Sequence, residues 1–285
     1  MLCCRRPGGS GSRRRGGTTM ADATRRELER TVVLVTALIA CLPGGGMAQP
    51  PGRAVGDTLE TKRHVSGVAV PLAESPLEMV PLRSPDGVDL TFAWRRPRGD
   101  GPFPVIVFLH GGGRQAGPGR LRQDLLEGAV PTRFLAAGFA VVACTRRPFW
   151  KQAGIDGEAG FDGAVDDTVR IVAEVRTLPR VDGTRVALYG GSGGGILAIV
   201  TAARTDVAGV VAGEPATVVP LAPEAGAGGA GPRGYGELMA NPRAAYVGER
   251  REAMRAWMAK VGCPVLVLQG RAEGLHTINT EILVP

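Results

Sequence analysis

Short apolar runs alternate along this chain with longer segments whose apolar residues recur at helical spacing. Four runs carry no charged residue: 104–109, 140–144, 207–212 and 264–268. Runs of this length are typical of strands buried on both faces of a parallel sheet. Helical spacing predicts helices over 131–138, 161–178 and 250–260. The alternation predicts an α/β fold with three layers, in which helices cover both faces of a mostly parallel central sheet.

A hairpin is expected where this fold begins. Residues 77–82 and 88–94 predict two paired strands about the turn 84–87, whose sequence Ser-Pro-Asp-Gly is typical of tight turns. Residues 49–76 are rich in Pro, Gly and polar side chains, which indicates a linker or an extended arm. We therefore assign the folded domain to residues 77–285.

The most informative motif is a serine embedded in glycines at 190–194, with the sequence Gly-Gly-Ser-Gly-Gly. An apolar run precedes it and an Ala-rich apolar segment follows, which predicts a strand, a tight turn with Ser192 at its tip, and a helix. Small neighbours suit such a strained turn, because Cβ atoms there would collide with the strand and the helix. The N–H of Gly193 would lie beside the serine at a helix N-terminus, where it can stabilise an oxyanion.

The sequence 190–194 fits other kinds of glycine-rich turn less well. A phosphate-binding loop requires lysine before its serine or threonine, and no lysine is near Ser192. A dinucleotide-binding loop opens after an early strand, whereas this strand comes late in the chain. The pattern therefore favours a nucleophilic serine over a turn that binds phosphate or has no role.

A second glycine-rich motif, His-Gly-Gly-Gly at 110–113, directly follows the expected strand 104–109. A glycine run there lets backbone N–H groups approach a ligand. This motif resembles the oxyanion loop of the α/β-hydrolase superfamily, and 190–194 resembles its nucleophile elbow. The resemblance covers about residues 77–285. Within the superfamily the chain looks most like the dienelactone-hydrolase and prolyl-oligopeptidase-like group.

The resemblance implies an enzyme that hydrolyses acyl bonds in small esters or peptides. Ser192 would attack the carbonyl, and the N–H groups of Gly193 and of Gly112 or Gly113 would hold the oxyanion. No metal or organic cofactor is implied. The substrate stays open, because neither the fold nor the nucleophile determines the leaving group.

The resemblance also indicates where the other catalytic residues should lie. The acid of the superfamily follows the strand two after the elbow strand, which here points to Glu273 after 264–268. Glu214, after the strand 207–212, is the alternative. Members usually have aspartate at the place of Glu273, and glutamate can serve the same chemistry.

The catalytic histidine is the missing part of the pattern. The chain has three histidines: His64, His110 and His276. The first lies in the arm, the second opens the oxyanion loop, and the third follows Glu273 too closely, since the superfamily's histidine comes one helix and one strand later. We therefore expect a domain without its last helix and strand, in which 264–268 is an edge strand and 275–285 is poorly anchored. The competing hypothesis is a non-catalytic exported binding protein, or an inactive fragment, on the same fold.

The net charge of +7 would suggest an anionic partner, but most of it lies in the first 48 residues. Residues 1–48 hold eight arginines and three acidic residues, a net charge of +5. A nucleic-acid-binding protein keeps its basic surface on the folded domain. We therefore expect no nucleic acid among the partners.

The basic head ends in a segment typical of a signal peptide. Residues 31–42 are uncharged and mostly apolar, a stretch too short to span a membrane. Arginines precede it, and the small residues Gly46 and Ala48 suit cleavage after Ala48. We expect an exported protein, periplasmic or extracellular. Lipid attachment at Cys41 or a weak twin-arginine pattern at 24–26 are alternative routes, and only the former would bring a membrane in as a partner.

Mature protein recovered from a bacterial host is expected to begin at Gln49, because the signal peptide would be removed after Ala48. Intact-mass measurement and N-terminal sequencing of the exported fraction test this. An uncleaved chain that stays in the cytoplasm would contradict the signal peptide, and a lipid on Cys41 would establish the lipoprotein route instead.

Overall fold

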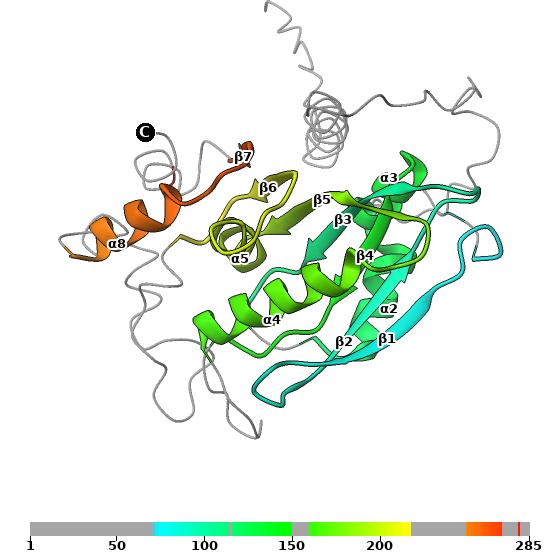
Figure 1. Ribbon diagram of the computed structural model, residues 1–285, viewed down its shortest axis with the longest axis horizontal. Coiled ribbons are helices and arrows are strands. Elements are labelled where there is room, and N and C mark those ends of the chain that lie inside the picture. Colours follow the sequence, from blue (N-terminus) through cyan, green and yellow to red (C-terminus); the bar gives the residue numbers. More distant parts are fainter. Residues whose placement is uncertain are drawn as a thin grey trace, which may run out of the picture.

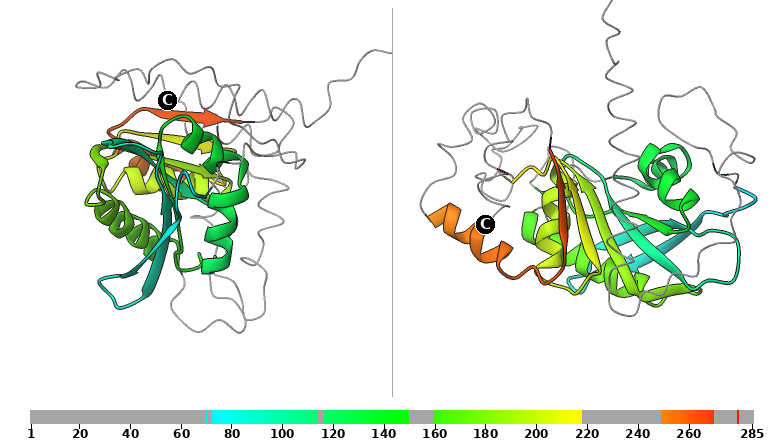
Figure 2. Two further views of the ribbon diagram at one scale, coloured as in Figure 1. Left: turned by 90° about the vertical axis from the view of Figure 1, so that its right-hand side faces the viewer. Right: turned by 90° about the horizontal axis from the view of Figure 1, so that it is seen from above.

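The computed structural model describes residues 70, 72–113, 116–149, 160–217, 249–269 and 279. Within this part of the chain, one seven-stranded sheet lies between two layers of helices (Figures 1 and 2). The α/β fold with a mostly parallel central sheet, predicted from the apolar pattern, is confirmed. None of the described helices is long and apolar enough to cross a membrane.

The sheet has the order β1-β2-β4-β3-β5-β6-β7. Its strands are β1 (Glu78–Arg83), β2 (Asp89–Arg95), β3 (Phe103–Leu109), β4 (Ala140–Cys144), β5 (Val181–Gly191), β6 (Gly209–Gly213) and β7 (Val265–Leu268). The hairpin β1–β2 is antiparallel and joins β4 in antiparallel register, whereas the strands from β4 to β7 are parallel to their neighbours. The carboxyl ends of the parallel strands therefore share one edge, where the loops that follow them meet.

Helices cover the two faces of the sheet in separate layers (Figure 2). They are α2 (Pro118–Glu127), α3 (Ala129–Ala136), α4 (Phe161–Val175), α5 (Gly193–Ala202) and α8 (Glu249–Met258). Successive residues of β3 alternate between the layers: Val105 and Val107 pack in the cluster of α4 and α5, and Ile106 packs in that of α2 and α3. Burial on both faces explains why the parallel strands are unbroken apolar runs.

The strand predictions with stated bounds hold to within about two residues at each end, and β4 has the predicted bounds 140–144. Strand β5 begins at Val181, earlier than the apolar run before the serine turn. Helix α2 was not predicted, because only Leu121 and Leu125 of its apolar residues are buried at helical spacing. Its remaining signal was Pro118 at the first helical turn, a position that proline favours. Strand β7 lies at the sheet's edge in the described part, as expected, and its Val265 is exposed.

Packing of the domain begins before Leu77, inside the segment assigned to the arm. Ser75 is buried, and its hydroxyl donates to the carbonyl of Arg96 at 2.6 Å. The buried guanidinium of Arg95 donates to the carbonyls of Ser75, Val70 and Leu125. Arg95 therefore ties the chain before β1 to the helix α2.

A buried ion cluster joins the hairpin to the helical layer. Arg147, three residues beyond β4, lies 2.8 Å from Asp167 of α4 and 2.7 Å from Asp86 in the β1–β2 turn. Asp167 is fully buried and also accepts the backbone N–H of Arg147 at 2.8 Å. Hydrogen bonding to Arg147 holds the pKa of Asp86 well below its ordinary value. Asp86 therefore stabilises the fold above its unfolded pKa, near 4, and this contribution is lost as the pH falls below it.

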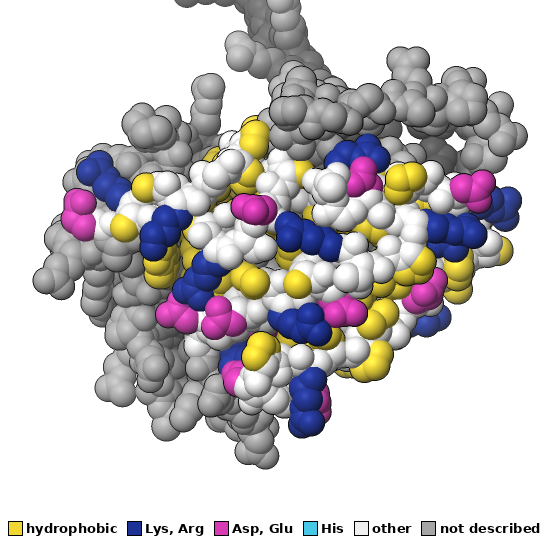
Figure 3. All heavy atoms as spheres, viewed as in Figure 1, with side chains coloured by type: hydrophobic (Ala, Val, Ile, Leu, Met, Phe, Trp, Pro, Cys, Tyr) yellow, Lys and Arg dark blue, Asp and Glu magenta, His cyan; other side chains and the backbone are white. Residues whose placement is uncertain are grey.

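The mixed charges of the surface agree with the charge distribution along the sequence. The face seen in Figure 3 carries basic and acidic side chains interspersed over the described residues.

Asp167→Asn is expected to lower the free energy of unfolding by about 3–5 kcal/mol, because it removes the buried negative partner of Arg147. Asp166→Asn is the matched control, since this neighbour in α4 is 64% exposed and pairs with Arg204. Its loss should cost about 0–1 kcal/mol. Urea denaturation measures both variants, and equal losses would contradict the buried cluster as a main support of the fold.

Candidate active site

Ser192 occupies the turn between β5 and α5, in an unusual backbone conformation. Its φ of 52° and ψ of −119° lie where non-glycine residues rarely occur. The Ser192 N–H donates to the carbonyl of Gly213 at 2.8 Å, and the Ser192 carbonyl accepts the N–H of Ala216 at 3.0 Å. Bonds on both sides of the residue hold the strain, which is common at functional sites. The Ser192 residue is exposed.

The turn has no space for side chains at the two outer glycines. A Cβ on Gly190 would collide with the carbonyl of Gly194, and a Cβ on Gly194 would collide with the carbonyl of Leu109. The backbones of β5, α5 and the end of β3 therefore approach one another more closely than any residue with a side chain allows. This close approach places the loop after β3 against the serine turn.

The loop 110–113 contacts the serine turn directly. A Cβ built on Gly111 would lie 3.7 Å from Cβ of Ser192, and one built on Gly193 would lie 2.8 Å from the carbonyl oxygen of Gly112. The structure thus places the loop at Gly111 and Gly112 against Ser192 and Gly193. Gly193 opens α5, and the N–H of a first helical residue has no partner inside the helix.

Each carbonyl of the glycine loop is held by a different group. The Gly111 carbonyl lies 2.9 Å from Nδ1 of His110, that of Gly112 accepts Nη2 of Arg146 at 2.8 Å, and that of Gly113 accepts the N–H of Phe149 at 2.9 Å. In a trans peptide the N–H points opposite to the carbonyl of the preceding residue. The N–H groups of Gly112 and Gly113 therefore point away from these anchors. No described residue accepts a hydrogen bond from either of them.

His110 supports the loop as a neutral side chain. Burial, with the positive charge of Arg146, lowers the pKa of His110 to about 4. The imidazole is therefore neutral at pH 7, and its contact with the Gly111 carbonyl makes Nδ1 the atom that carries the proton. This geometry fits an anchor of the loop.

Of the two candidate acids, Glu214 and Glu273, the structure describes only Glu214. Glu214 directly follows β6 with a φ of 45°, and its N–H donates to the carbonyl of Leu268 at 2.7 Å. Gly191 pairs with Gly213 in the sheet, so Glu214 and Ser192 leave neighbouring strands at the same level. Glu273 lies outside the described residues, as do His64 and His276.

A polar network that the sequence did not predict lies next to this edge of the sheet. The Thr217 hydroxyl donates to Oδ1 of Asn279 at 2.7 Å, and Nδ2 of Asn279 donates to Oε1 of Gln269 at 2.5 Å. Asn279 is 2% exposed. The expectation that 275–285 is poorly anchored is therefore wrong at this residue. No local pattern could have found the contact, because it joins residues 62 positions apart.

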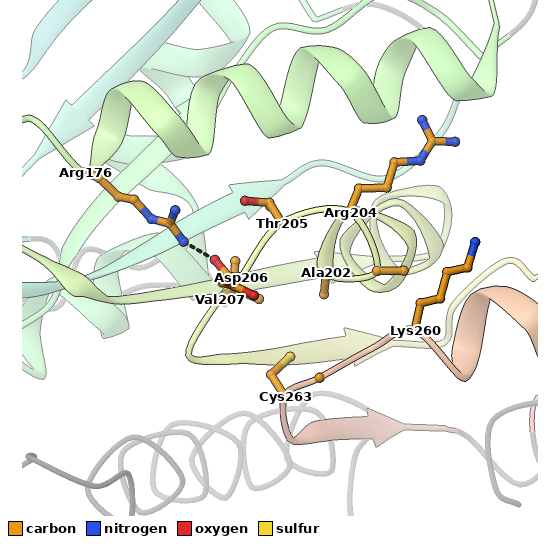
Figure 4. Close-up of a pocket in the computed structure, with 10 residues that line it drawn as sticks. Arg176, Ala202, Arg204, Thr205, Asp206, Val207, Lys260 and Cys263 are labelled. Atoms are coloured by element: carbon orange, nitrogen blue, oxygen red, sulfur yellow. Dashed lines mark hydrogen bonds between the residues drawn. The ribbon is translucent and has the colours of Figure 1, made fainter.

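A pocket of about 440 Å³ is shown in Figure 4. It lies at the opposite end of the sheet from Ser192, which follows the carboxyl end of β5. Its lining includes residues 205–207 before β6 and 262–263 before β7, so it opens at the amino ends of these strands. Three cations line it, Arg176, Arg204 and Lys260, each just past the end of a helix. Cations stabilise helix carboxyl termini, so this arrangement has a structural explanation.

Comparisons with known proteins concern the family and the fold. The family model for acetyl xylan esterase (AXE1) matches residues 158–217, which contain the serine turn. Dipeptidyl peptidase 4 of Porphyromonas gingivalis is 16% identical over 74% of this chain and 30% of its own, with a TM-score of 0.51. Esterase Est22 is 16% identical over 89% and 81% of the two chains, with a TM-score of 0.47.

A hypothetical protein of Pseudomonas aeruginosa is 22% identical over 57% of this chain, with a TM-score of 0.41. The chain spans about half the length of the first solved structures it matches, 50% and 45%. No curated protein matches the sequence. The likeness to dipeptidyl peptidase 4, together with the strand order, shows the fold.

Gly190→Ala is expected to lower the free energy of unfolding by about 2–3 kcal/mol or more, because the added methyl group must displace the backbone at Gly194. Gly119→Ala in α2 is the matched control. No atom lies within 4 Å of its Cβ position, and alanine favours a helix over glycine by about 1 kcal/mol. Thermal denaturation compares them, and a Gly190→Ala variant as stable as the wild type would contradict the close approach.

Proposed function

The chain has the α/β-hydrolase fold, and we propose that it is a serine hydrolase of acyl bonds. One observation carries the proposal: an exposed serine in a strained backbone conformation, pressed against a loop whose N–H groups have no acceptor among the described residues. A turn with no catalytic role would gain nothing from strain at Ser192, since glycine would fit the same conformation at less cost.

The proposed reaction begins with attack of Ser192 Oγ on the acyl carbon. The carbonyl oxygen becomes an oxyanion, which accepts hydrogen bonds from the N–H of Gly193 and from that of Gly112 or Gly113. The serine proton passes to a base and then to the leaving group, and water later hydrolyses the acyl-enzyme by the reverse sequence. The positive end of α5 adds to the stabilisation of the oxyanion.

The base is a histidine in the proposed mechanism, as in other serine hydrolases. His110 does not serve, because its Nδ1 contacts the Gly111 carbonyl and its Nε2, the ring atom left to accept a proton, is buried without a hydrogen bond to Ser192. The base therefore comes from outside the described residues. We propose Glu273 as the carboxylate that orients it, since Glu273 follows β7, and keep Glu214 as the alternative because it lies beside the serine turn.

Esters are the substrate class that we propose first. The matching family model describes acetyl xylan esterases, and the residues that it matches include Ser192. A small acyl group such as acetyl is therefore the appropriate first probe. Peptides remain the second class, because the same nucleophile and oxyanion hole cleave amides as well as esters.

We propose that the protein acts outside the cytoplasm. The support comes from the head alone: arginines, then the apolar stretch 31–42, then the small residues Gly46 and Ala48 before Gln49. In that location the substrate would be an extracellular or periplasmic ester.

The full-length protein is expected to hydrolyse an aryl acetate and to react with a fluorophosphonate at Ser192. Ser192→Ala should abolish labelling and lower kcat/KM by about 10⁴-fold or more, because it removes the nucleophile. Ser84→Ala, in the β1–β2 turn, is the control and should label normally. Labelling that persists in Ser192→Ala, or a wild type that neither labels nor turns over ester, would refute the proposal and favour a binding protein.

The same assay distinguishes the two candidate acids. Glu273→Gln is expected to lower kcat by about 10⁴-fold, because the neutral amide cannot orient and stabilise the charged base. Glu214→Gln is expected to retain most of the activity. The reverse result would assign the acid to Glu214.

A further inference from the structure

Arg146 is a buried cation beside the candidate oxyanion hole. It follows β4 and is 1% exposed, yet it forms no ion pair with any carboxylate of the described residues. Its neighbour Arg147 takes both nearby carboxylates, those of Asp86 and Asp167. The two adjacent arginines therefore have different surroundings, and only Arg147 has the partners that a structural ion pair needs.

Arg146 contacts the glycine loop 110–113 and, through Phe149, the first residue of α5, the two segments that form the candidate oxyanion hole. Its Nη2 donates to the Gly112 carbonyl at 2.8 Å, and its guanidinium carbon lies 4.0 Å above the ring of Phe149. Phe149 in turn donates its N–H to the Gly113 carbonyl, and its ring edge lies 2.9 Å from the position of a Cβ on Gly193. Arg146 thus supports the loop directly and the first residue of α5 through Phe149.

This burial is costly for stability alone. A buried charge that forms no ion pair regains little of its lost hydration, and an apolar side chain of similar size would fill the same space. The carboxylate charge that acts on Arg146 is that of Asp167, which is bonded to Arg147. The Nε atom of Arg146 also has no acceptor among the described residues. Burial lowers the pKa of Arg146 to about 10, so the guanidinium still carries its charge at neutral pH.

We propose that Arg146 is a positioning residue of the oxyanion hole, which orients the Gly112–Gly113 peptide and stabilises the developing oxyanion by its positive charge. This inference rests on the proposed function. By holding the Gly112 carbonyl, Arg146 directs the N–H of Gly113 to the opposite side of the peptide plane. The substrate carbonyl carries little charge before attack, so the effect belongs to the transition state and should appear in kcat and not in KM.

The test compares Arg146→Met, Arg146→Lys and the matched control Arg95→Lys in the full-length protein. Arg95 is also buried and bonded to carbonyls, but it lies in the contact between β2, α2 and the preceding arm. With an aryl acetate, Arg146→Met should lower kcat about 10–100-fold, less than the loss of a whole oxyanion-hole donor, with KM within about threefold of the wild type. Arg146→Lys keeps the positive charge, so its kcat should lie between that of the wild type and that of Arg146→Met. Arg95→Lys should leave kcat unchanged.

A folded Arg146→Met variant with kcat within about twofold of the wild type would overturn the proposal, as would a rise in KM at constant kcat. If Arg146→Met does not fold, the kcat of Arg146→Lys is compared with that of Arg95→Lys instead. Equal kcat values would refute the proposal. Hydrogen exchange of the Phe149 amide, which donates to the Gly113 carbonyl, tests the positioning without turnover. This amide should exchange faster in Arg146→Lys than in Arg95→Lys, and equal exchange refutes the proposal. A wild type without Ser192-dependent turnover instead refutes the proposed function.

Discussion

The site depends on one steric constraint, the close approach of three backbone segments where β5 turns into α5. A methyl group at Gly190 or Gly194 would collide with a backbone carbonyl of the opposing segment. Because the segments meet without side chains, the turn is sharp, Ser192 adopts a positive φ, and the loop after β3 packs against it. The apolar sheet beneath provides the rigidity that this strain requires, since strain persists only where the surroundings determine the conformation.

Three arginines of the described residues are buried, and each has a different set of bonding partners. Arg95 satisfies three carbonyls where the arm, β2 and α2 meet, and Arg147 neutralises two carboxylates between the hairpin and α4. Both are explained by stability. Arg146 also donates to two carbonyls, those of Gly112 and Arg147, but it pairs with no carboxylate of the described residues, and we explain its burial by a use of its charge at the site.

Most of the fold followed from the sequence because the parallel strands are buried on both faces and are therefore continuous apolar runs. Helix α2 escaped prediction, since it buries too few apolar residues for a clear helical period. At the site, glycine spacing indicated the serine turn and the loop, which the structure brings into contact. Arg146 could not be distinguished from Arg147 in the sequence, because only the tertiary contacts separate them. The network at Asn279 joins distant segments and left no local pattern.

The most direct test of this account is to trap the acyl-enzyme and locate the acyl group. Trypsin should release residues 186–204 as one peptide, in which Ser192 is the only serine. After brief reaction of the full-length protein with an activated acetyl ester and acid quenching, tandem mass spectrometry should place one acetyl group on Ser192. Acetylation confined to lysines or to the N-terminus, with this peptide unmodified while ester is turned over, would contradict the account.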